Sequence, residues 1–140
     1  MVEENPEKHL EFIQNVITRM ANNSFLLKGW TVTIVAALFA LAAQNSNSKF
    51  VILAFFPVVA FWILDAFYLW QERLFRALYN DIRKKPKDCI QLEGPFSLDT
   101  KDYKGKERSW AKTTVSKTLI IFYGTIIIAI CVVMVFLRVI

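Results

Sequence analysis

The sequence is poor in the residues that most often carry chemistry in proteins. It has one histidine, two cysteines (Cys89 and Cys131) and four glycines that stand singly. So few histidines and cysteines predict no metal cluster and no disulfide, and scattered glycines form no phosphate-binding loop or dinucleotide-binding turn. A nucleophile elbow, an HExxH motif and a pair of carboxylates in a cleft are also missing. The sequence therefore predicts no enzyme, no cofactor and no metal site.

A cleavable signal peptide is also not expected, because the first 24 residues contain no apolar core of sufficient length. Neither end carries a lipidation motif, so we expect the polypeptide itself to provide any membrane anchor. Apolar residues, in contrast, are abundant: 55% of the chain is hydrophobic, and these residues are clustered rather than spread. This pattern is typical of an integral membrane protein.

Three apolar stretches are long enough to cross a bilayer as helices. They cover residues 25–43, 50–70 and 119–137, and each reaches roughly 30 Å at about 1.5 Å per residue. A short polar turn at 44–49 makes the first two antiparallel, and Pro57 should kink the second slightly. We therefore expect an all-α membrane fold with three transmembrane helices, two of them in segment 25–70 and the third in segment 118–140.

Residues 6–23 show the pattern of an amphipathic helix. Apolar residues recur there at spacings of three and four: Leu10, Ile13, Val16, Ile17 and Met20. Asn22-Asn23-Ser24 interrupts the stripe, and Ser24 could cap a new helix. We therefore predict a separate helix within residues 1–24. Its acidic start favours packing on the protein over lying on the membrane surface.

The helical pattern of the second span continues beyond the apolar run and stops at Pro86. Glu72 and Arg76 form a favourable i,i+4 pair, and Leu74, Leu78 and Ile82 keep one apolar face. Segment 71–117 is thus predicted to hold a helical extension and a loop. Residues 86–107 fit either a short hairpin or an irregular loop.

The two apolar stripes outside the predicted spans are too large to remain exposed to water. Either a single chain packs them together, or neighbouring chains cover them. Further aromatic side chains around the stripes favour neighbouring chains, joined in a ring by cyclic symmetry. We therefore predict a homo-oligomer with contacts at Leu74, Leu78 and Ile82.

Basic residues predict the orientation in the membrane. Fifteen of the seventeen lysines and arginines lie within residues 1–28, up to the start of the first span, or in segment 71–117; the exceptions are Lys49 and Arg138. The positive-inside rule then places the N-terminus and segment 71–117 in the cytoplasm, and the 44–49 turn and the C-terminus outside. The basic run 83–87 fits this role better than nucleic-acid binding, because no nucleic-acid-binding motif accompanies it.

Two charged residues fall inside the predicted spans. Lys28 and Asp65 should lie at similar depth, since their helices are antiparallel neighbours. A charge in hydrocarbon costs about 3 kcal/mol or more unless it is paired or hydrated. We expect an ion pair, or a hydrogen-bonded cluster that includes Tyr68 or Tyr123. Such a cluster is either a clamp between helices or, less economically, an ion or proton relay.

Several stretches resemble a known family. They are SFLLKGWTVTIVAALFALAA, FPVVAFWILDAFYLWQERLFRALYNDIR, PFSLDT and SKTLIIFYG. Together they are similar to the RipA-like family of small octameric proteins of the bacterial inner membrane. The resemblance covers about residues 20–125, and the block LDAFYLWQERLFRALY is its most specific part. The resemblance implies a bacterial cytoplasmic-membrane protein that forms an octamer. It identifies no catalytic residues in this sequence.

These observations together predict a non-enzymatic, homo-oligomeric protein of the bacterial inner membrane that acts as a scaffold or a pore-like assembly. Its expected partners are the lipid bilayer and further copies of itself, and not nucleic acid. One alternative is a membrane-disrupting effector of a defence or toxin system, kept silent until a partner triggers it. Another is a small ion carrier that uses Asp65.

Overall fold

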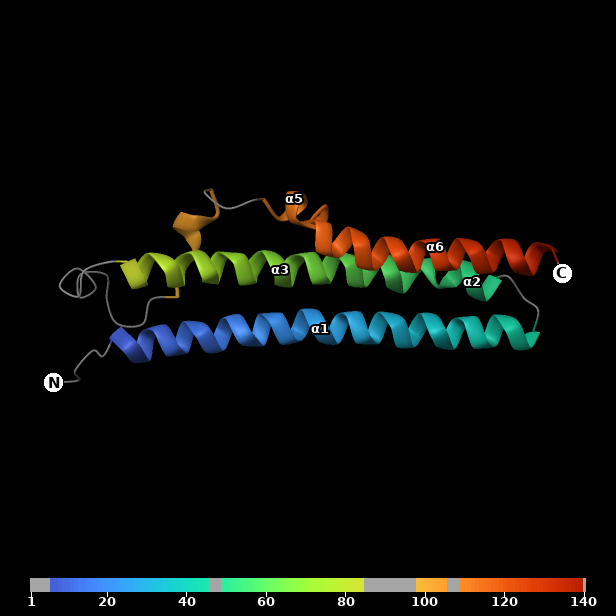
Figure 1. Ribbon diagram of the computed structural model, residues 1–140, viewed down its shortest axis with the longest axis horizontal. Helices are drawn as coiled ribbons and strands as arrows, with labels where there is room; N and C mark the ends of the chain where they lie inside the picture. Colours follow the sequence, from blue (N-terminus) through green and yellow to red (C-terminus); the bar gives the residue numbers. More distant parts are fainter. Residues whose placement is uncertain (1–5, 46–48, 85–97, 106–108, 140) are drawn as a thin grey trace.

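The computed structural model describes residues 6–45, 49–84, 98–105 and 109–139. Their regular elements are α1 (Pro6–Asn45), α2 (Lys49–Leu53), α3 (Phe55–Lys84), η1 (Lys101–Tyr103), α5 (Trp110–Thr114) and α6 (Lys117–Val139), all helical. The long helices lie side by side in an elongated bundle (Figure 1). Three helical stretches, Glu7–Gln44, Lys49–Lys84 and Lys117–Leu137, are long and apolar enough to cross a membrane. The chain is an all-α membrane protein, as predicted.

Helix α1 runs without interruption for 40 residues, about 60 Å. The break predicted at Asn22-Asn23-Ser24 is therefore wrong, and residues 1–24 are not a helix of their own. Asparagine and serine cost only about 0.5 kcal/mol each in a helix interior. The Ser24 hydroxyl does not cap a helix. It donates a hydrogen bond to Asp65 of α3, which offsets the unfavourable helix propensity.

The second span is broken before Pro57. Helix α2 ends at Leu53 and α3 begins at Phe55. Proline has no N–H, so Pro57 cannot donate to the carbonyl of Leu53, and the helix is interrupted one turn earlier. Ala54 N donates instead to Val51 O at 3.2 Å, which makes a tighter turn. Beyond this point α3 continues to Lys84 and carries the predicted extension.

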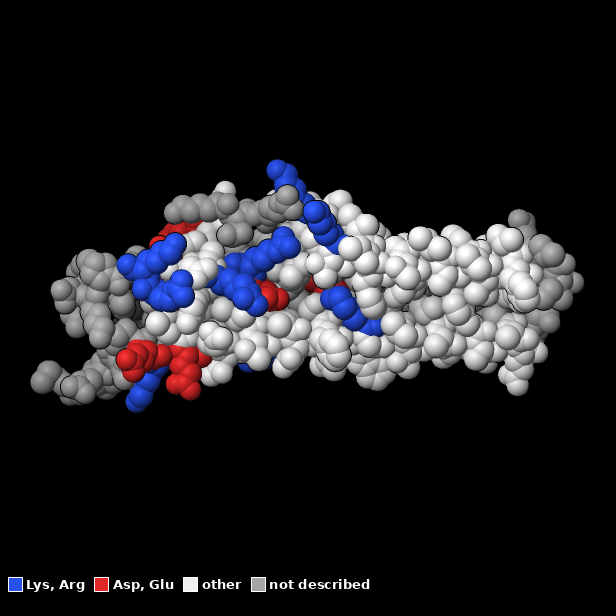
Figure 2. Space-filling model, viewed as in Figure 1, with Lys and Arg blue, Asp and Glu red and all other residues white. Residues whose placement is uncertain are grey.

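Charge divides the molecule along its length. Figure 2 shows lysine, arginine, aspartate and glutamate gathered over one half, while the other half of this face lacks them. We call residues 6–24, 71–84, 98–105 and 109–116 the charged half, and residues 25–45, 49–70 and 117–139 the apolar half. The predicted spans thus occupy the apolar half, and α1 and α3 both extend into the charged half.

The core of the apolar half is formed by α1, α2, α3 and α6. Its fully or nearly fully buried side chains come from all four helices and include Val35, Val51, Val58, Leu119 and Tyr123. Helix α3 lies at the centre, with α1 on one side and α6 on another. The residues that face away from this core remain exposed, as expected for side chains in contact with lipid.

The charged half has a separate small core. Ile13 and Ile17 of α1 pack against Leu78 and Ile82 of α3, and Leu74 is also fully buried. Of the two arrangements left open by the sequence, the structure shows the one in which a single chain packs both stripes together. Leu74, Leu78 and Ile82 are thus covered within one chain and need no neighbouring chain for that purpose.

The segment that follows α3 returns to it through its described part, residues 98–105. Leu98 and Tyr103 pack against the core of the charged half, the Tyr103 hydroxyl donates to Asp81 at 2.7 Å, and Lys104 lies 6.0 Å from the Trp70 ring centroid. The 3₁₀ turn η1, Lys101–Tyr103, thus lies on the surface of α3. Most of the hairpin considered for residues 86–107 lies outside the described residues.

Candidate functional site: a buried polar cluster joining three helices

Asp65 is the centre of a polar cluster between α1, α3 and α6. Its side chain is fully buried, and Lys28 Nζ lies 2.5 Å from its Oδ2 atom. The lysine side chain is 21% exposed, so it reaches the carboxylate from the edge of the bundle. The structure thus brings together the two charged residues that the sequence places within the spans.

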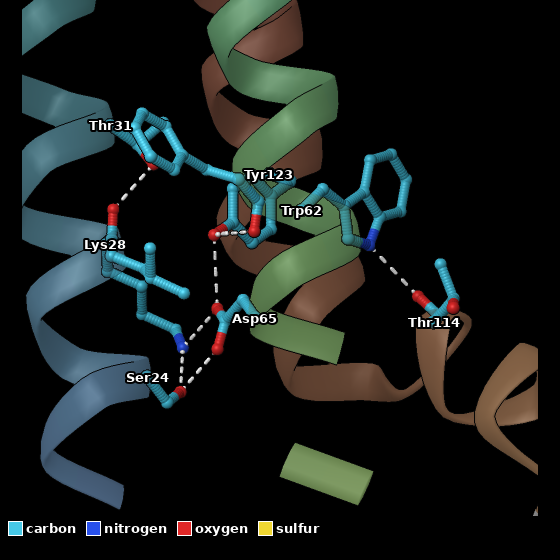
Figure 3. A network of polar contacts seen from close by, with 9 residues as sticks. Ser24, Lys28, Thr31, Trp62, Asp65, Thr114 and Tyr123 are labelled. Atoms are coloured by element: carbon cyan, nitrogen blue, oxygen red, sulfur yellow. Dashed lines mark hydrogen bonds and ion pairs between the residues drawn. The ribbon is translucent and has the colours of Figure 1, made fainter. Parts of the chain in front are cut away.

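Two hydroxyl groups complete the shell around the Asp65 carboxylate (Figure 3). Ser24 donates to Oδ1 and accepts a hydrogen bond from Lys28 Nζ at 2.8 Å. From α6, the Tyr123 hydroxyl lies 3.1 Å from Oδ2 and 3.2 Å from the carbonyl oxygen of Phe61. One carboxylate therefore has partners on both helices that flank α3.

Trp62 extends the cluster toward α5. Its ring stacks on that of Tyr123, with centroids 5.7 Å apart and planes 3° from parallel. Its indole N–H donates to the Thr114 carbonyl oxygen at 3.0 Å. A partly buried indole in apolar surroundings needs such an acceptor, and this bond attaches the end of α5 to the first part of α3.

The chemistry of the cluster is that of a closed ion pair. A positive and a negative charge neutralise each other, and the carboxylate accepts from an ammonium and two hydroxyl groups. A nucleophile with an adjacent base would be needed for covalent catalysis, and none of these side chains forms one. Within the described ranges, no group of three or more His, Cys, Asp or Glu side chains could hold a metal ion. The arrangement is suited to holding helices together.

The sequence located part of this cluster. Of the two candidate tyrosines, Tyr123 belongs to it and Tyr68 does not. Ser24 was missed because it was assigned to a helix cap; its position one turn before Lys28 was the available signal. Trp62 was also missed, although a tryptophan deep in an apolar run, one turn before an aspartate, calls for a hydrogen-bond partner.

The other predicted contact residues, Leu74, Leu78 and Ile82, lie further along α3 in the charged half and take no part in the cluster. Of the two cysteines, Cys131 is a free, exposed thiol on α6, and Cys89 lies outside the described residues.

A second, smaller polar site lies in the charged half. The Lys101 backbone N–H donates to Asp99 Oδ1 at 2.9 Å. This bond lowers the pKa of Asp99 below its usual value, assisted by the nearby Lys101 charge. Since the bond closes the turn into η1, its role is local and does not extend to Asp65.

Comparison of the chain with protein-family models, curated proteins and solved structures gave no match. The similarity to the RipA-like family therefore rests on the sequence stretches given above.

Proposed function

We propose that this chain is a non-enzymatic scaffold of the bacterial inner membrane that acts through self-assembly, as a ring or a pore-like structure. Within each chain, α1 and α3 form a stiff hairpin that connects the bilayer to a projection in the cytoplasm. The surface of that projection is where other copies of the chain bind.

The observation that carries this proposal is the closed state of the Asp65 cluster. An enzyme or carrier needs a polar group that can release its present partner and bind a substrate. Asp65 is instead fully buried and bound to Lys28, Ser24 and Tyr123. Replacing any of these partners would cost the interaction that holds two helices together, which supports a structural role.

The proposed orientation rests on the distribution of charge. Fifteen of seventeen basic residues lie within residues 1–28 or in segment 71–117, so the charged half faces the cytoplasm by the positive-inside rule. The C-terminus then lies in the periplasm. The bacterial inner membrane follows from the family resemblance.

Self-assembly is supported by apolar surface outside the spans. Phe12 of α1 is 48% exposed, although it lies next to the buried face of this helix, and Val115 is 64% exposed. In lipid, apolar surface provides no driving force for association, but in water it does. The exposed face of α1 around Phe12 is therefore the proposed contact between copies.

Native mass spectrometry of the full chain, released from several mild detergents and from nanodiscs, tests this proposal. We expect a homo-oligomer larger than a dimer, an octamer if the family resemblance holds. Phe12→Ser should shift the distribution toward smaller species, because it removes exposed apolar area without touching the protomer core. Asn15→Ser, at an exposed polar position of the same helix, is the matched control. Monomer under all conditions would rule out self-assembly.

One observation favours an alternative, the ion carrier: Asp65 is an ionisable group buried within a span. Proton flux into liposomes containing the purified protein distinguishes the two functions. The scaffold proposal expects no flux above that of empty liposomes. If the protein shows proton flux, and Asp65→Asn abolishes this flux while the oligomeric state is unchanged, the carrier function would be supported and the scaffold proposal rejected.

A further inference from the structure

A groove opens between α1 and α6 on the side of the bundle. Both helices pack on α3, and the space between them has a volume of about 720 Å³. This volume is within the roughly 300–1,000 Å³ of typical ligand sites. It is lined by Lys28 and Val32 of α1 and by one face of α6.

The groove is polar at one end and apolar along the rest. Lys117, the first residue of α6, lies at the end next to the charged half, on the same side as Lys28. Beyond these lysines the wall consists mainly of Val32, Ile121 and Ile126. Thr125 adds little polarity, because its hydroxyl already donates to the Ile121 carbonyl oxygen at 2.6 Å.

The length of the groove matches one leaflet of a bilayer. Its α6 wall runs from Lys117 to Ile126, about 14 Å along the helix axis. Half of the roughly 30 Å hydrocarbon core is about 15 Å. Figure 1 shows α6 starting near the middle of α3 and running toward the apolar end. Lys117, at the start of α6, therefore lies near the level of the lipid headgroups, Lys28 at the edge of the hydrocarbon, and the apolar wall at the level of the acyl chains.

The lysines at this end can receive an anion. The Lys117 side chain is exposed and, among the described residues, has no ion-pair partner. Lys28 uses two of its three N–H donors for Asp65 and Ser24, and its ammonium lies 5.9 Å from the Phe122 ring centroid, beside the groove. Basic pockets between transmembrane helices on the cytoplasmic side can bind anionic lipid headgroups.

We propose that this groove binds one anionic phospholipid of the surrounding bilayer, with its phosphate at Lys117 and Lys28 and an acyl chain along Val32, Ile121 and Ile126. The lipid fills the space between two helices that contact mainly α3. Its headgroup also adds negative charge on the open side of Lys28. This inference is independent of self-assembly and of the proposed scaffold function.

Native mass spectrometry of the purified full chain with phosphatidylglycerol or phosphatidylcholine of identical acyl chains tests the proposal. The wild type should retain one phosphatidylglycerol per chain in preference to phosphatidylcholine. Lys117→Gln should reduce this preference about fivefold, the effect of one basic side chain near a membrane surface. The control, Lys112→Gln, removes an exposed lysine of neighbouring α5 that does not line the groove and should leave the preference unchanged.

A second pair of variants tests the position of the acyl chain. Val32→Phe fills the groove and should abolish lipid retention, whereas Val132→Phe, at an exposed valine of α6 outside the groove, should not. Equal retention of both lipids by the wild type, or full retention by Val32→Phe, would overturn the proposal. A wild type that retains no lipid, together with loss of oligomers in Val32→Phe, would also overturn it, since a second copy of the chain would then occupy the groove.

Discussion

Asp65 shows how a charge can be kept within an apolar run. An isolated charge at this depth costs about 3 kcal/mol or more, and the nearby ammonium and two hydroxyl donors offset much of that cost. The ion pair is therefore weak evidence for high stability, but it ties the packing to one register. Only one register of α1 against α3 places Lys28 and Ser24 beside the carboxylate.

The first prediction concerns the coupling of Lys28 and Asp65. Each of Asp65→Asn and Lys28→Met leaves one polar group without its partner, so each should lower the free energy of unfolding by about 3 kcal/mol. The double variant should lose less than the sum of the two, by about 0.5–3 kcal/mol. Unfolding in mixed detergent micelles, followed by circular dichroism, measures all four proteins.

The exposed pair Glu72 and Arg76, joined at 2.7 Å, is the matched control for this cycle. Its coupling should be no more than about 0.5 kcal/mol, because the arginine is 59% exposed to solvent. Additive losses at Lys28 and Asp65 would show that the two buried charges do not interact.

The second prediction concerns Tyr123. Tyr123→Phe keeps the stacking on Trp62 and removes the hydroxyl that bonds to Asp65. The free energy of unfolding should fall by about 1 kcal/mol, within the range for hydrogen bonds between membrane helices. Tyr68→Phe, the other tyrosine considered from the sequence, should change it by much less. Equal effects of the two substitutions on the free energy of unfolding would show that the Tyr123 hydroxyl does not stabilise the cluster.

These residues also show what the sequence could predict of the site. The sequence identified Lys28 and Asp65 because a charge within an apolar run has a high free energy in hydrocarbon. Their similar depth followed from the antiparallel arrangement of the two helices that carry them. The choice between Tyr68 and Tyr123 depends on the rotation of α6 around α3, which no local pattern encodes. Ser24 was assigned to a helix cap because a serine fits both a cap and a contact between helices, and only its position one turn before Lys28 indicated the second role.

At the level of elements, the spans were predicted well and their junctions poorly. Length and hydropathy suffice for a span, because the bilayer sets both. The continuity of α1 through Asn22-Asn23-Ser24 depends on contacts with α3 on both sides of these residues. The helix propensities of asparagine and serine differ from those of better helix formers by only a few tenths of a kcal/mol, which is too little to break a helix held by such contacts. For Pro57 the sequence predicted only a slight kink, whereas the structure interrupts the helix one turn earlier, at Ala54.

The third prediction concerns the small core of the charged half. Leu78→Ala should cost about 2–4 kcal/mol, because Leu78 packs between Ile13, Ile17 and Ile82. Amide exchange, followed by mass spectrometry, should accelerate in residues 6–23 and 71–84 and remain slow in the apolar half. Asn80→Ala, at an exposed position of the same helix, is the control. Unchanged exchange in residues 6–23 would show that the two stripes do not support each other.

For the whole molecule, the fourth prediction concerns orientation. In intact cells Cys89 should be protected from a membrane-impermeant thiol reagent, and it should react once the membrane is opened. Cysteines introduced at Asn47 or after Ile140 should react in intact cells. The Cys89→Ala variant gives the background labelling, because its remaining cysteine, Cys131, lies within the third span. Labelling of Cys89 from outside would reverse the proposed topology.

The position of the Asp65 cluster along α1 has a mechanical consequence. Ser24 and Lys28 lie near the middle of the 40 residues of this helix, and the chain offers no hinge on either side. Because both arms of α1 also pack on α3, the two helices tilt together as one body. A tilt of about 10° about the cluster moves the two ends of α1, each about 30 Å away, by roughly 5 Å in opposite directions. A change in bilayer thickness that tilts the helices in lipid thereby also moves the N-terminal end of α1.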